Sequence, residues 1–263
     1  MTARLQQVFR TAPGRARLAT QFLLAFGAAS IVLVPALAAG VPLAAAWVAL
    51  AVAACLAWAL ARAWPRDRIV RRLPYATIVV RFGDLLAEAE RERADLVVGC
   101  GDTFDLDAGS LGTAYGGEPD RLGDDLDRAL AARVPVSVAT REAKPVGRVR
   151  RYPIGTVAAL GGGPHRRVYC LACARTGEDP SMDDLWTALG HLWTSVRDSE
   201  RVAVPLLGSE LWLGRENLVK LIVLSFAAQA QAWPVCRELV VVVPSEETRN
   251  VDLRRLETFL TNL

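Results

Sequence analysis

Two glycine-rich segments carry the residues best suited to bind a ligand. Each segment follows an apolar run that predicts a β-strand and precedes an amphipathic run that predicts a helix. Backbone N–H groups near glycine and a helix N-terminus suit phosphate oxygens, although a plain turn is the alternative for either segment alone. The candidate binding residues are Gly101, Asp102, Thr103, Ser110, Leu111, Gly112 and Thr113 in the first segment, and Gly208, Ser209, Glu210, Leu211, Trp212 and Gly214 in the second.

Other kinds of catalytic or metal site are not predicted. The sequence contains no serine-nucleophile elbow, P-loop or two-histidine metal motif. Cys170 and Cys173 have the spacing of a zinc or redox pair, but they lie in the apolar run Val168–Ala174, and residues three apart in a strand point to opposite faces. We therefore expect no metal site and cysteines that stay reduced in a reducing cytoplasm.

The elements that must position the glycine-rich segments alternate along the chain after Pro74. The predicted strands are Ala76–Phe82, Asp95–Cys100, Val134–Thr140, Gly155–Leu160, Val168–Ala174, Val202–Leu207 and Leu239–Val243. The predicted helices are Asp84–Arg93, Asp120–Arg133, Met182–Asp198, Arg215–Ala232 and Val251–Leu260. Several strands are apolar on both faces, which indicates one α/β domain over residues 73–263 with a mixed sheet covered by helices on both faces. Ser181 is the predicted start of the third helix, and Asn250 the predicted cap of the last.

The N-terminal part, residues 1–72, predicts a transmembrane helical hairpin with basic flanks. Residues 18–61 are 44 consecutive positions without Asp, Glu, Lys or Arg. As one helix they would be roughly 66 Å long, about twice the hydrocarbon thickness of a bilayer. Gly40 and Pro42 favour a turn, so the predicted spans are Leu18–Ala38 and Leu43–Ala61. A buried hairpin of a soluble protein and a cleaved signal peptide are the alternatives.

Charge gives the expected orientation. Arginines flank both spans and the turn carries no charge, so both termini are expected in the cytoplasm. Residues 1–72 hold nine arginines and one aspartate, a net +8, and the whole chain is +3, which leaves −5 for residues 73–263. A mildly acidic domain is not expected to bind nucleic acid, whereas the arginine cluster suits anionic lipid headgroups.

A ladder of alanines marks the second predicted span. Ala45, Ala49, Ala53, Ala57 and Ala61 recur every four residues and so share one helix face. Small residues let helices approach closely in lipid, which predicts packing against the first span or against another subunit. Because 11 of the 21 residues from 43 to 63 are alanine, a ladder that arises from composition alone is the alternative.

The order of the pieces after Pro74 resembles the macro domain, a module that binds ADP-ribose. Phe82-Gly-Asp-Leu85 is similar to the family's Gly-Asp-Ile-Thr element, and Val202-Ala-Val-Pro-Leu-Leu-Gly-Ser209 to its apolar strand and phosphate loop. The last strand and helix, 239–260, complete a resemblance that covers about residues 75–263. It implies a three-layer α/β/α fold with a mixed sheet.

The resemblance also implies roles for single residues. Asp84 would accept a hydrogen bond from the adenine amino group, a role compatible with capping a helix. Gly208, Ser209, Leu211 and Gly214 would line the diphosphate, with Trp212 near the distal ribose. Asp102 and its neighbours replace the Asn-Ala-Ala-Asn signature of hydrolytic macro domains, Ser110–Thr113 replaces a triple-glycine loop, and Glu210 replaces a glycine. We therefore expect binding without a catalytic residue.

A narrower resemblance joins both parts of the chain. Two N-terminal spans, Gly101-Asp-Thr-Phe104 after the second strand, a Ser-Leu loop and Tyr152-Pro-Ile-Gly-Thr-Val157 are similar to the membrane effector of type II Thoeris antiphage defence. This implies a protein of the bacterial inner membrane that uses no cofactor. It would bind an ADP-ribose derivative, the histidine conjugate, made by a TIR-domain partner, and then form a homo-oligomer that disrupts the membrane. A membrane-anchored ADP-ribosyl hydrolase and a scaffold with a vestigial nucleotide fold are the alternatives.

Overall fold

The chain forms two compact units. The structure, a computed structural model, describes residues 12–38, 45–63, 67–105, 119–142, 144–161 and 167–263. The units are Met1–Arg66 and Asp67–Leu263. The predicted boundary lies after residue 72, whereas the second unit begins at Asp67, because strand β1 (Arg68–Arg72), predicted as part of the basic flank, belongs to that unit.

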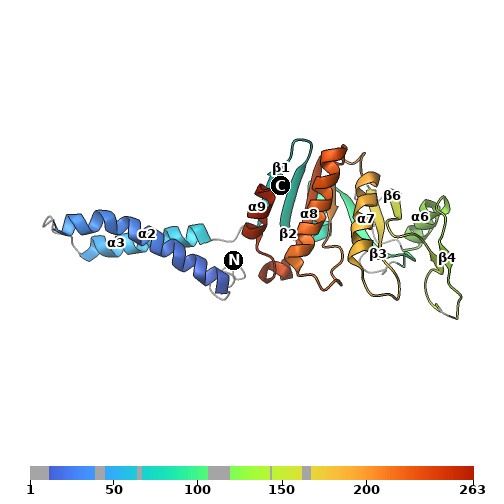
Figure 1. Cartoon of the computed structure of the whole chain (residues 1–263), viewed down its shortest axis with the longest axis horizontal. Coiled ribbons are helices and arrows are strands. Elements are labelled where there is room, and N and C mark those ends of the chain that lie inside the picture. The colour runs from blue at the N-terminus through green and yellow to red at the C-terminus, as the bar shows by residue number, and fades with distance from the viewer. Residues whose placement is uncertain (1–11, 39–44, 64–66, 106–118, 143, 162–166) are drawn as a thin grey trace. The chain divides into compact units, whose positions relative to one another are not determined.

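The first unit is a helical hairpin of α2 (Ala12–Ala38) and α3 (Ala45–Ala63), which pack against each other (Figure 1). Half-buried positions of α2 recur every three or four residues, at Leu18, Phe22, Ala25 and Ala29, as one packed helix face requires. On α3, Cys55 and Ala59 are buried.

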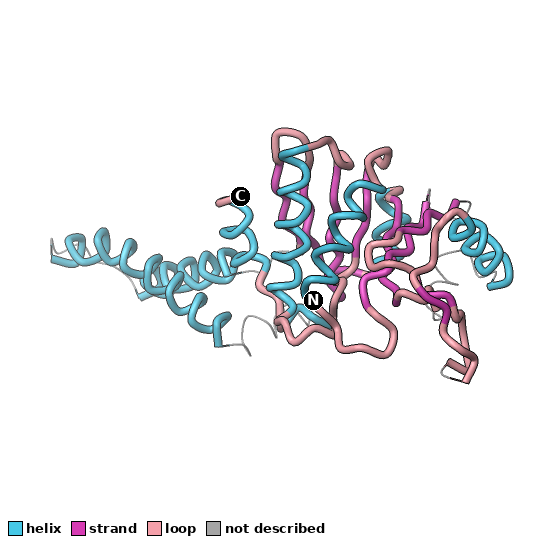
Figure 2. The backbone as a smooth tube through the Cα atoms, turned by 45° about the vertical axis from the view of Figure 1, so that its right-hand side comes forward, coloured by secondary structure: helices cyan, strands magenta, loops and turns pink. Residues whose placement is uncertain are grey.

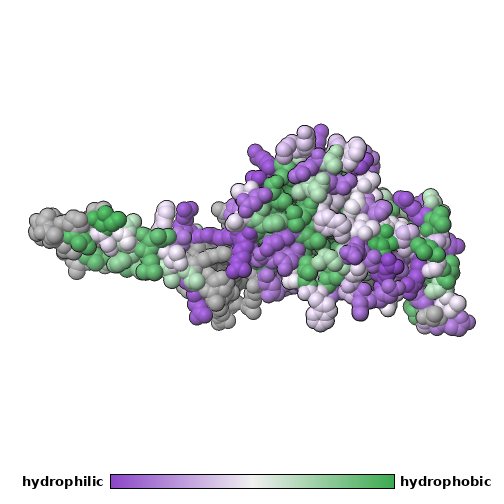
Figure 3. Space-filling view, in the orientation of Figure 1, coloured by the Kyte–Doolittle hydropathy of each residue, from purple (hydrophilic) through white to green (hydrophobic). Residues whose placement is uncertain are grey.

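The alanine ladder lies on the outside of this unit. Ala49, Ala53, Ala57 and Ala61 are exposed, so the ladder does not pack against α2, and the side chain of Ala45 lies outside the described residues. Large apolar side chains share this exposure, and the visible surface of the hairpin is mostly hydrophobic (Figure 3). They are Leu23, Leu24, Phe26, Ile31, Val34, Val48, Leu50, Leu56 and Trp58. None of the described helices meets the length and apolarity that crossing a membrane requires.

The second unit is built on a seven-stranded sheet with the order β1-β2-β9-β8-β3-β7-β6. The five central strands are parallel, and β1 and β6 pair antiparallel at the two edges. The strands after β1 are β2 (Thr77–Gly83), β3 (Asp95–Gly101), β6 (Val157–Gly161), β7 (Arg167–Ala174), β8 (Arg201–Val204) and β9 (Glu238–Pro244).

Helices cover both faces of the sheet (Figures 1 and 2). One face packs against α4 (Leu85–Glu92) and α6 (Pro119–Ala131). The other packs against α7 (Met182–Ser195), α8 (Arg215–Ala232) and α9 (Leu253–Thr261), and the 3₁₀ turn η1 (Ser245–Arg249) follows β9. This confirms the predicted three-layer fold with a mixed sheet.

The apolar runs make the sheet because both of its faces are buried. In β9, Leu239, Val241 and Val243 enter the core beneath α7, α8 and α9, while Val240 and Val242 face the opposite layer. Alternate side chains of a strand point to opposite faces, so a continuous apolar run is what a doubly covered strand requires.

Three local predictions were wrong. The predicted strand Val134–Thr140 is reduced to β4 (Ser137–Val138), which pairs with β5 (Arg150–Arg151) outside the main sheet. Its valines are exposed because no helix covers them there. Strand β1 was not predicted, because its arginines, which suit an edge strand, interrupt the apolar run by which the other strands were predicted. The last helix is capped by Asp252, which accepts from the Arg254 amide, and not by Asn250.

Candidate functional site

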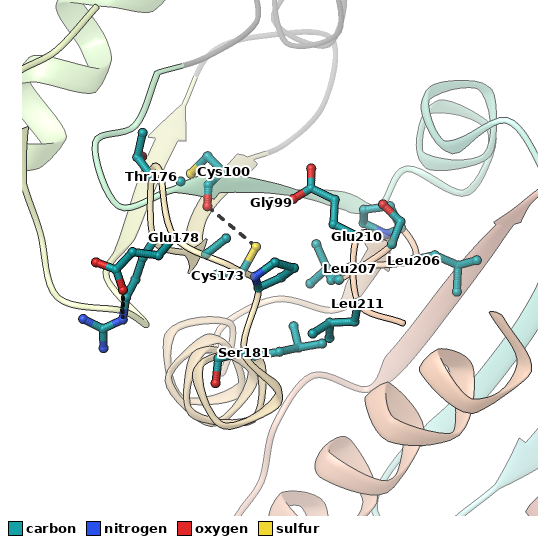
Figure 4. Close-up of a pocket in the computed structure, with 18 of the residues that line it drawn as sticks. Gly99, Cys100, Cys173, Thr176, Glu178, Ser181, Leu206, Leu207, Glu210 and Leu211 are labelled. Carbon is teal, nitrogen blue, oxygen red and sulfur yellow. Dashed lines mark hydrogen bonds and ion pairs between the residues drawn. The ribbon is translucent and has the colours of Figure 1, made fainter. Parts of the chain in front are cut away.

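A pocket of about 530 Å³ opens where the carboxyl ends of β3, β7 and β8 meet (Figure 4). Ligands of open α/β sheets bind at this edge of the strands. Three segments line the pocket: 98–101 at the end of β3, 173–181 after β7, and 205–211 after β8, with Leu185 from α7.

The segment after β8 is shaped by Gly208. Its φ of +75° lies in the left-handed region, and a Cβ there would lie 2.6 Å from Leu185 Cδ2. The tight turn is closed by the Leu211 amide donating to the Gly208 carbonyl at 2.9 Å. In the described part of the chain, the amides of Ser209 and Glu210 have no backbone acceptor, so they are available to a ligand in the pocket.

Arg215 holds this loop against the body of the domain. Its Nη1 donates to the Ser209 carbonyl at 2.7 Å, and its Nε pairs with Glu247 Oε1 at 3.0 Å. Nη1 and Nε of this guanidinium therefore have protein partners, which fix the loop to η1.

The end of β3 forms the pocket floor because its glycines allow close packing. A Cβ on Gly99 would lie 2.7 Å from Leu207 Cδ2, and one on Gly101 would lie 2.7 Å from Thr176 Oγ1. The floor and the two flanking loops are thus in direct contact, and a larger residue at either glycine would push them apart.

Asp102 and Thr103 position the pocket without lining it. The side chain of Asp102 is 7% exposed, and its Oδ1 accepts from the Thr176 amide at 2.9 Å while Oδ2 lies 3.5 Å from Arg151 Nη1. Thr103 is fully buried, and its hydroxyl lies 3.0 Å from that of Thr176. Both side chains fasten the segment after β7 to the end of β3.

The segment after β7 is part of the site that sequence reasoning missed. Gly177 and Glu178 line the pocket, as does Ser181, which was predicted only as a helix start and is the N-cap of α7 without a side-chain cap bond. Part of the pattern that predicts a binding loop was present, since an apolar strand precedes this segment. The segment belongs to the pocket because β7 lies beside β3 in the sheet, and the spacing of residues along the chain does not reveal that order.

Two acidic residues belong to the lining of the pocket. Glu210 comes from the loop after β8 and Glu178 from the loop after β7 (Figure 4). Glu178 lies 3.8 Å from both Arg151 and Arg175, and Arg175 makes a closer pair with Asp184 at 2.9 Å. The lining of the pocket therefore has no excess of positive charge.

Asp84 lies apart from the pocket lining, at the end of β2. It caps α4, and its Oδ1 accepts from the Ala87 amide at 2.9 Å. Strands β9 and β8 separate β2 from β3, which places Asp84 about 10 Å from the end of β8 by strand spacing. Its second oxygen makes no hydrogen bond within the described residues.

The remaining predicted residues fall into two groups. Gly101, Gly208, Ser209, Glu210 and Leu211 line the pocket together. Trp212 is fully exposed and Gly214 is the N-cap of α8, so the structure does not bring these two into the lining. The predicted residues 110–113 lie outside the described part of the chain.

The cysteine pair diverges as its spacing in a strand requires. Cys170 is buried beneath α6, while Cys173 faces the pocket and packs against the opposite core. Burial raises the pKa of the Cys173 thiol to about 11. Among the described residues, no group of His, Cys, Asp or Glu side chains is placed to hold a metal ion.

Comparison with known families identifies the second unit. The family model described as "Thoeris protein ThsA, Macro domain" matches residues 78–244. The chain belongs to this family. The match begins in β2 and ends with β9, so it contains all three segments of the pocket in this ThsA-type macro domain. Among curated proteins, a search finds no match.

Solved structures agree on the fold. A mutant of the Oceanobacillus iheyensis macrodomain is similar with a TM-score of 0.54 and 13% identity over 75% of this chain and 100% of that chain. The same macrodomain with ADP gives 0.52 and 13% over 74% and 98%, and a mutant with ADPR gives 0.52 and 13% over 74% and 100%. At this identity the likeness shows the macro fold.

The raised pKa of Cys173 predicts a pocket thiol that reacts slowly near neutral pH. At pH 8 a thiol with a pKa near 11 is thiolate in only about one molecule in a thousand, so alkylation should be roughly two orders of magnitude slower than for a free cysteine. Mass spectrometry after iodoacetamide treatment between pH 7 and 11 measures this. Labelling of native Cys173 at pH 8 as fast as in urea-unfolded protein would contradict it.

Proposed function

We propose that this chain senses an ADP-ribose-derived nucleotide through its macro domain and does not hydrolyse it. The observation that carries the proposal is the loop after β8, where Ser209 and Glu210 line a pocket at the ends of parallel strands and their amides have no backbone acceptor within the described residues. Such amides bind phosphate oxygens without a cationic side chain. The ADP and ADPR named with the similar macrodomain structures are ligands of that class.

The distance between the pocket and Asp84 supports a ligand with two ends. The diphosphate occupies the loop after β8, and the adenine extends along the sheet edge to Asp84. Since Oδ1 of Asp84 is used by the Ala87 amide, Oδ2 is the oxygen that accepts from the adenine amino group. The distal ribose then lies toward the segment after β7, where Glu178 and Glu210 would meet the group attached to it.

The hydrogen bonds of Asp102 support the proposed absence of hydrolysis. A residue that positions a water for attack must face the substrate, whereas both oxygens of Asp102 are committed to Thr176 and Arg151 at the back of the pocket. The alternative, a membrane-anchored ADP-ribosyl hydrolase, is favoured by one feature: Glu210 and Glu178 are carboxylates within the pocket that could activate water.

The role of the hairpin completes the proposal. We infer that α2 and α3 act at the bacterial inner membrane, that both termini are cytoplasmic, and that ligand binding drives homo-oligomers that disrupt the bilayer. The support is the uncharged run 18–61, which extends through residues that the structure does not describe, and the exposed apolar side chains of both helices. A TIR-domain protein would supply the signal, histidine-ADP-ribose, with no further cofactor.

Calorimetric titration of the full chain with ADP-ribose and with its histidine conjugate tests the binding. We expect one ligand per chain, tighter binding of the conjugate, and recovery of both ligands unchanged after incubation. Absence of binding would overturn the proposal, and release of free ADP-ribose from an ADP-ribosylated substrate would replace it with the hydrolase.

Replacing Gly208 with Val should weaken binding of ADP-ribose at least tenfold. The β-branched side chain is strained at a φ of +75° and would overlap Leu185 and Leu211, which displaces the amides of the loop. Gly161→Val is the matched control, because Gly161 lies in a strand with open space around its Cβ position. Equal affinity of a folded Gly208→Val variant and of the wild type would show that the loop is only a connection.

Two variants separate the helix-capping role of Asp84 from the binding role of its carboxylate. Asp84→Ala and Asp84→Ser should both lose about 1–3 kcal/mol of ADP-ribose binding free energy, because the adenine amino group loses its acceptor. Only Asp84→Ala should also lower the free energy of unfolding, by about 1 kcal/mol, since serine still caps a helix. Calorimetry and urea unfolding measure the two effects. Unchanged affinity in Asp84→Ser would remove the carboxylate from the site.

The alanine ladder predicts where copies of the chain meet. Changing Ala49 and Ala53 together to Leu should leave ADP-ribose affinity intact and abolish ligand-induced assembly and toxicity, because these exposed positions do not contact α2. Crosslinking in membranes and leakage of a vesicle dye measure assembly and its effect. If the double variant assembles and permeabilises vesicles as the wild type does, the ladder is not an assembly contact and arises from the alanine-rich composition alone.

A further inference from the structure

A second cavity, of about 360 Å³, lies between α6 and the β4–β5 hairpin. The proposed function does not use it. Figure 1 shows α6 beside β4 at the end of the sheet where β6 is the edge strand. Its lining is Asp127 and Ala131 from α6, and Arg141, Arg148, Val149, Arg150 and Tyr152 from the hairpin and its continuation.

The cavity concentrates positive charge. Three guanidinium groups line it against one carboxylate, Asp127, which is paired with Arg148. Arg141 Nη1 donates to the Gly147 carbonyl at 2.8 Å, which leaves its other nitrogens for a ligand. The backbone of Arg150 belongs to the β4–β5 ladder, while its guanidinium makes no hydrogen bond or ion pair with any residue that the structure describes. The +2 excess of the lining is therefore not balanced by those residues.

Tyr152 adds a polar group without a partner. The residue is 6% exposed, and its ring makes an edge contact with Phe104 at a centroid distance of 5.6 Å. Its hydroxyl makes no hydrogen bond with a described residue and is not one of the fully buried polar atoms that lack a partner, so a ligand in the cavity can reach it. This hydroxyl can donate to a ligand in the cavity that accepts hydrogen bonds.

We propose that this cavity binds the phosphoryl group of a small phosphorylated molecule. Arg141, Arg148 and Arg150 would donate to its oxygens, and the Tyr152 hydroxyl would donate one further hydrogen bond. Guanidinium groups match phosphate geometry in a planar, two-pronged fashion, and arginine is the only cation of the lining. The volume lies near the lower end of the range for ligand pockets, which suits a compact metabolite larger than a phosphate ion.

The second cavity is separate from the first pocket. Arg150 and Arg151 are neighbours on β5, so their side chains point to opposite sides of the hairpin. Arg151 donates to the Thr176 carbonyl at 2.9 Å, on the rim of the first pocket, while Arg150 lines the second cavity. Occupancy of one can therefore be measured without the other.

Protection of Arg150 from phenylglyoxal, followed by mass spectrometry of the detergent-solubilised full chain, tests the site. Pyrophosphate and AMP should each slow modification of Arg150 at least fivefold, whereas Arg197, an exposed arginine outside both pockets, should be unaffected in the same sample. Sodium chloride at matched ionic strength controls for screening of charge. Equal protection of both arginines, or of neither, would overturn the proposal.

Two further experiments test the Tyr152 hydrogen bond and the class of ligand. Tyr152→Phe keeps the ring against Phe104 and should raise the pyrophosphate concentration needed for protection about fivefold; an unchanged concentration would contradict the assigned hydrogen bond. Phosphatidylcholine vesicles that contain phosphatidic acid present the same phosphoryl chemistry on a membrane. Protection by these vesicles but not by pyrophosphate or AMP would overturn the assignment to a small molecule.

Discussion

The buried carboxylate of Asp102 is the interaction on which the arrangement of this domain's ligand edge depends. It joins the end of β3 to the segment after β7 through the Thr176 amide and to β5 through Arg151. Backbone hydrogen bonds reinforce the same junction, from the Asp102 amide to Ala174 and from the Tyr152 amide to Asp102. A buried carboxylate is costly unless it is paired, so this junction can form only when all three segments are in place.

The two cavities follow from this junction. On one side of β5, Arg151 and Thr176 complete the rim of the pocket over β3, β7 and β8. On the other side, Arg150 and Tyr152 line the cavity against α6. Asp102, which stands where hydrolytic macro domains have their Asn-Ala-Ala-Asn signature, is thus a structural anchor in this macro domain. The first pocket therefore has two acidic residues and the backbone amides of Ser209 and Glu210 in its lining, and Asp102 lies outside that lining.

Much of the fold could be predicted from local pattern, because the central strands are buried on both faces and hydrophobic runs mark such strands directly. The bounds of α8 and the starts of α7, β3 and β9 lie within a residue of their predicted positions. The strand of residues 134–140 failed for the opposite reason: its valines have the pattern of a covered strand, but no layer covers them. An apolar pattern shows which side chains a segment is able to bury. Whether they are buried depends on which other elements pack against the segment.

For the site, the sequence by itself located the tight turn after β8, because a glycine between an apolar strand and a helix is a local feature of the chain, and Gly208 has the left-handed φ that favours glycine. It also determined that Cys170 and Cys173 would diverge, since strand geometry alone separates them. Only the tertiary structure decided that the segment after β7 belongs to the pocket, that Asp102 is withdrawn from it, and that Trp212 points into solvent. These outcomes depend on β3 lying between β7 and β8, an order of parallel strands that is set by the packing of the crossover helices and not by any local pattern.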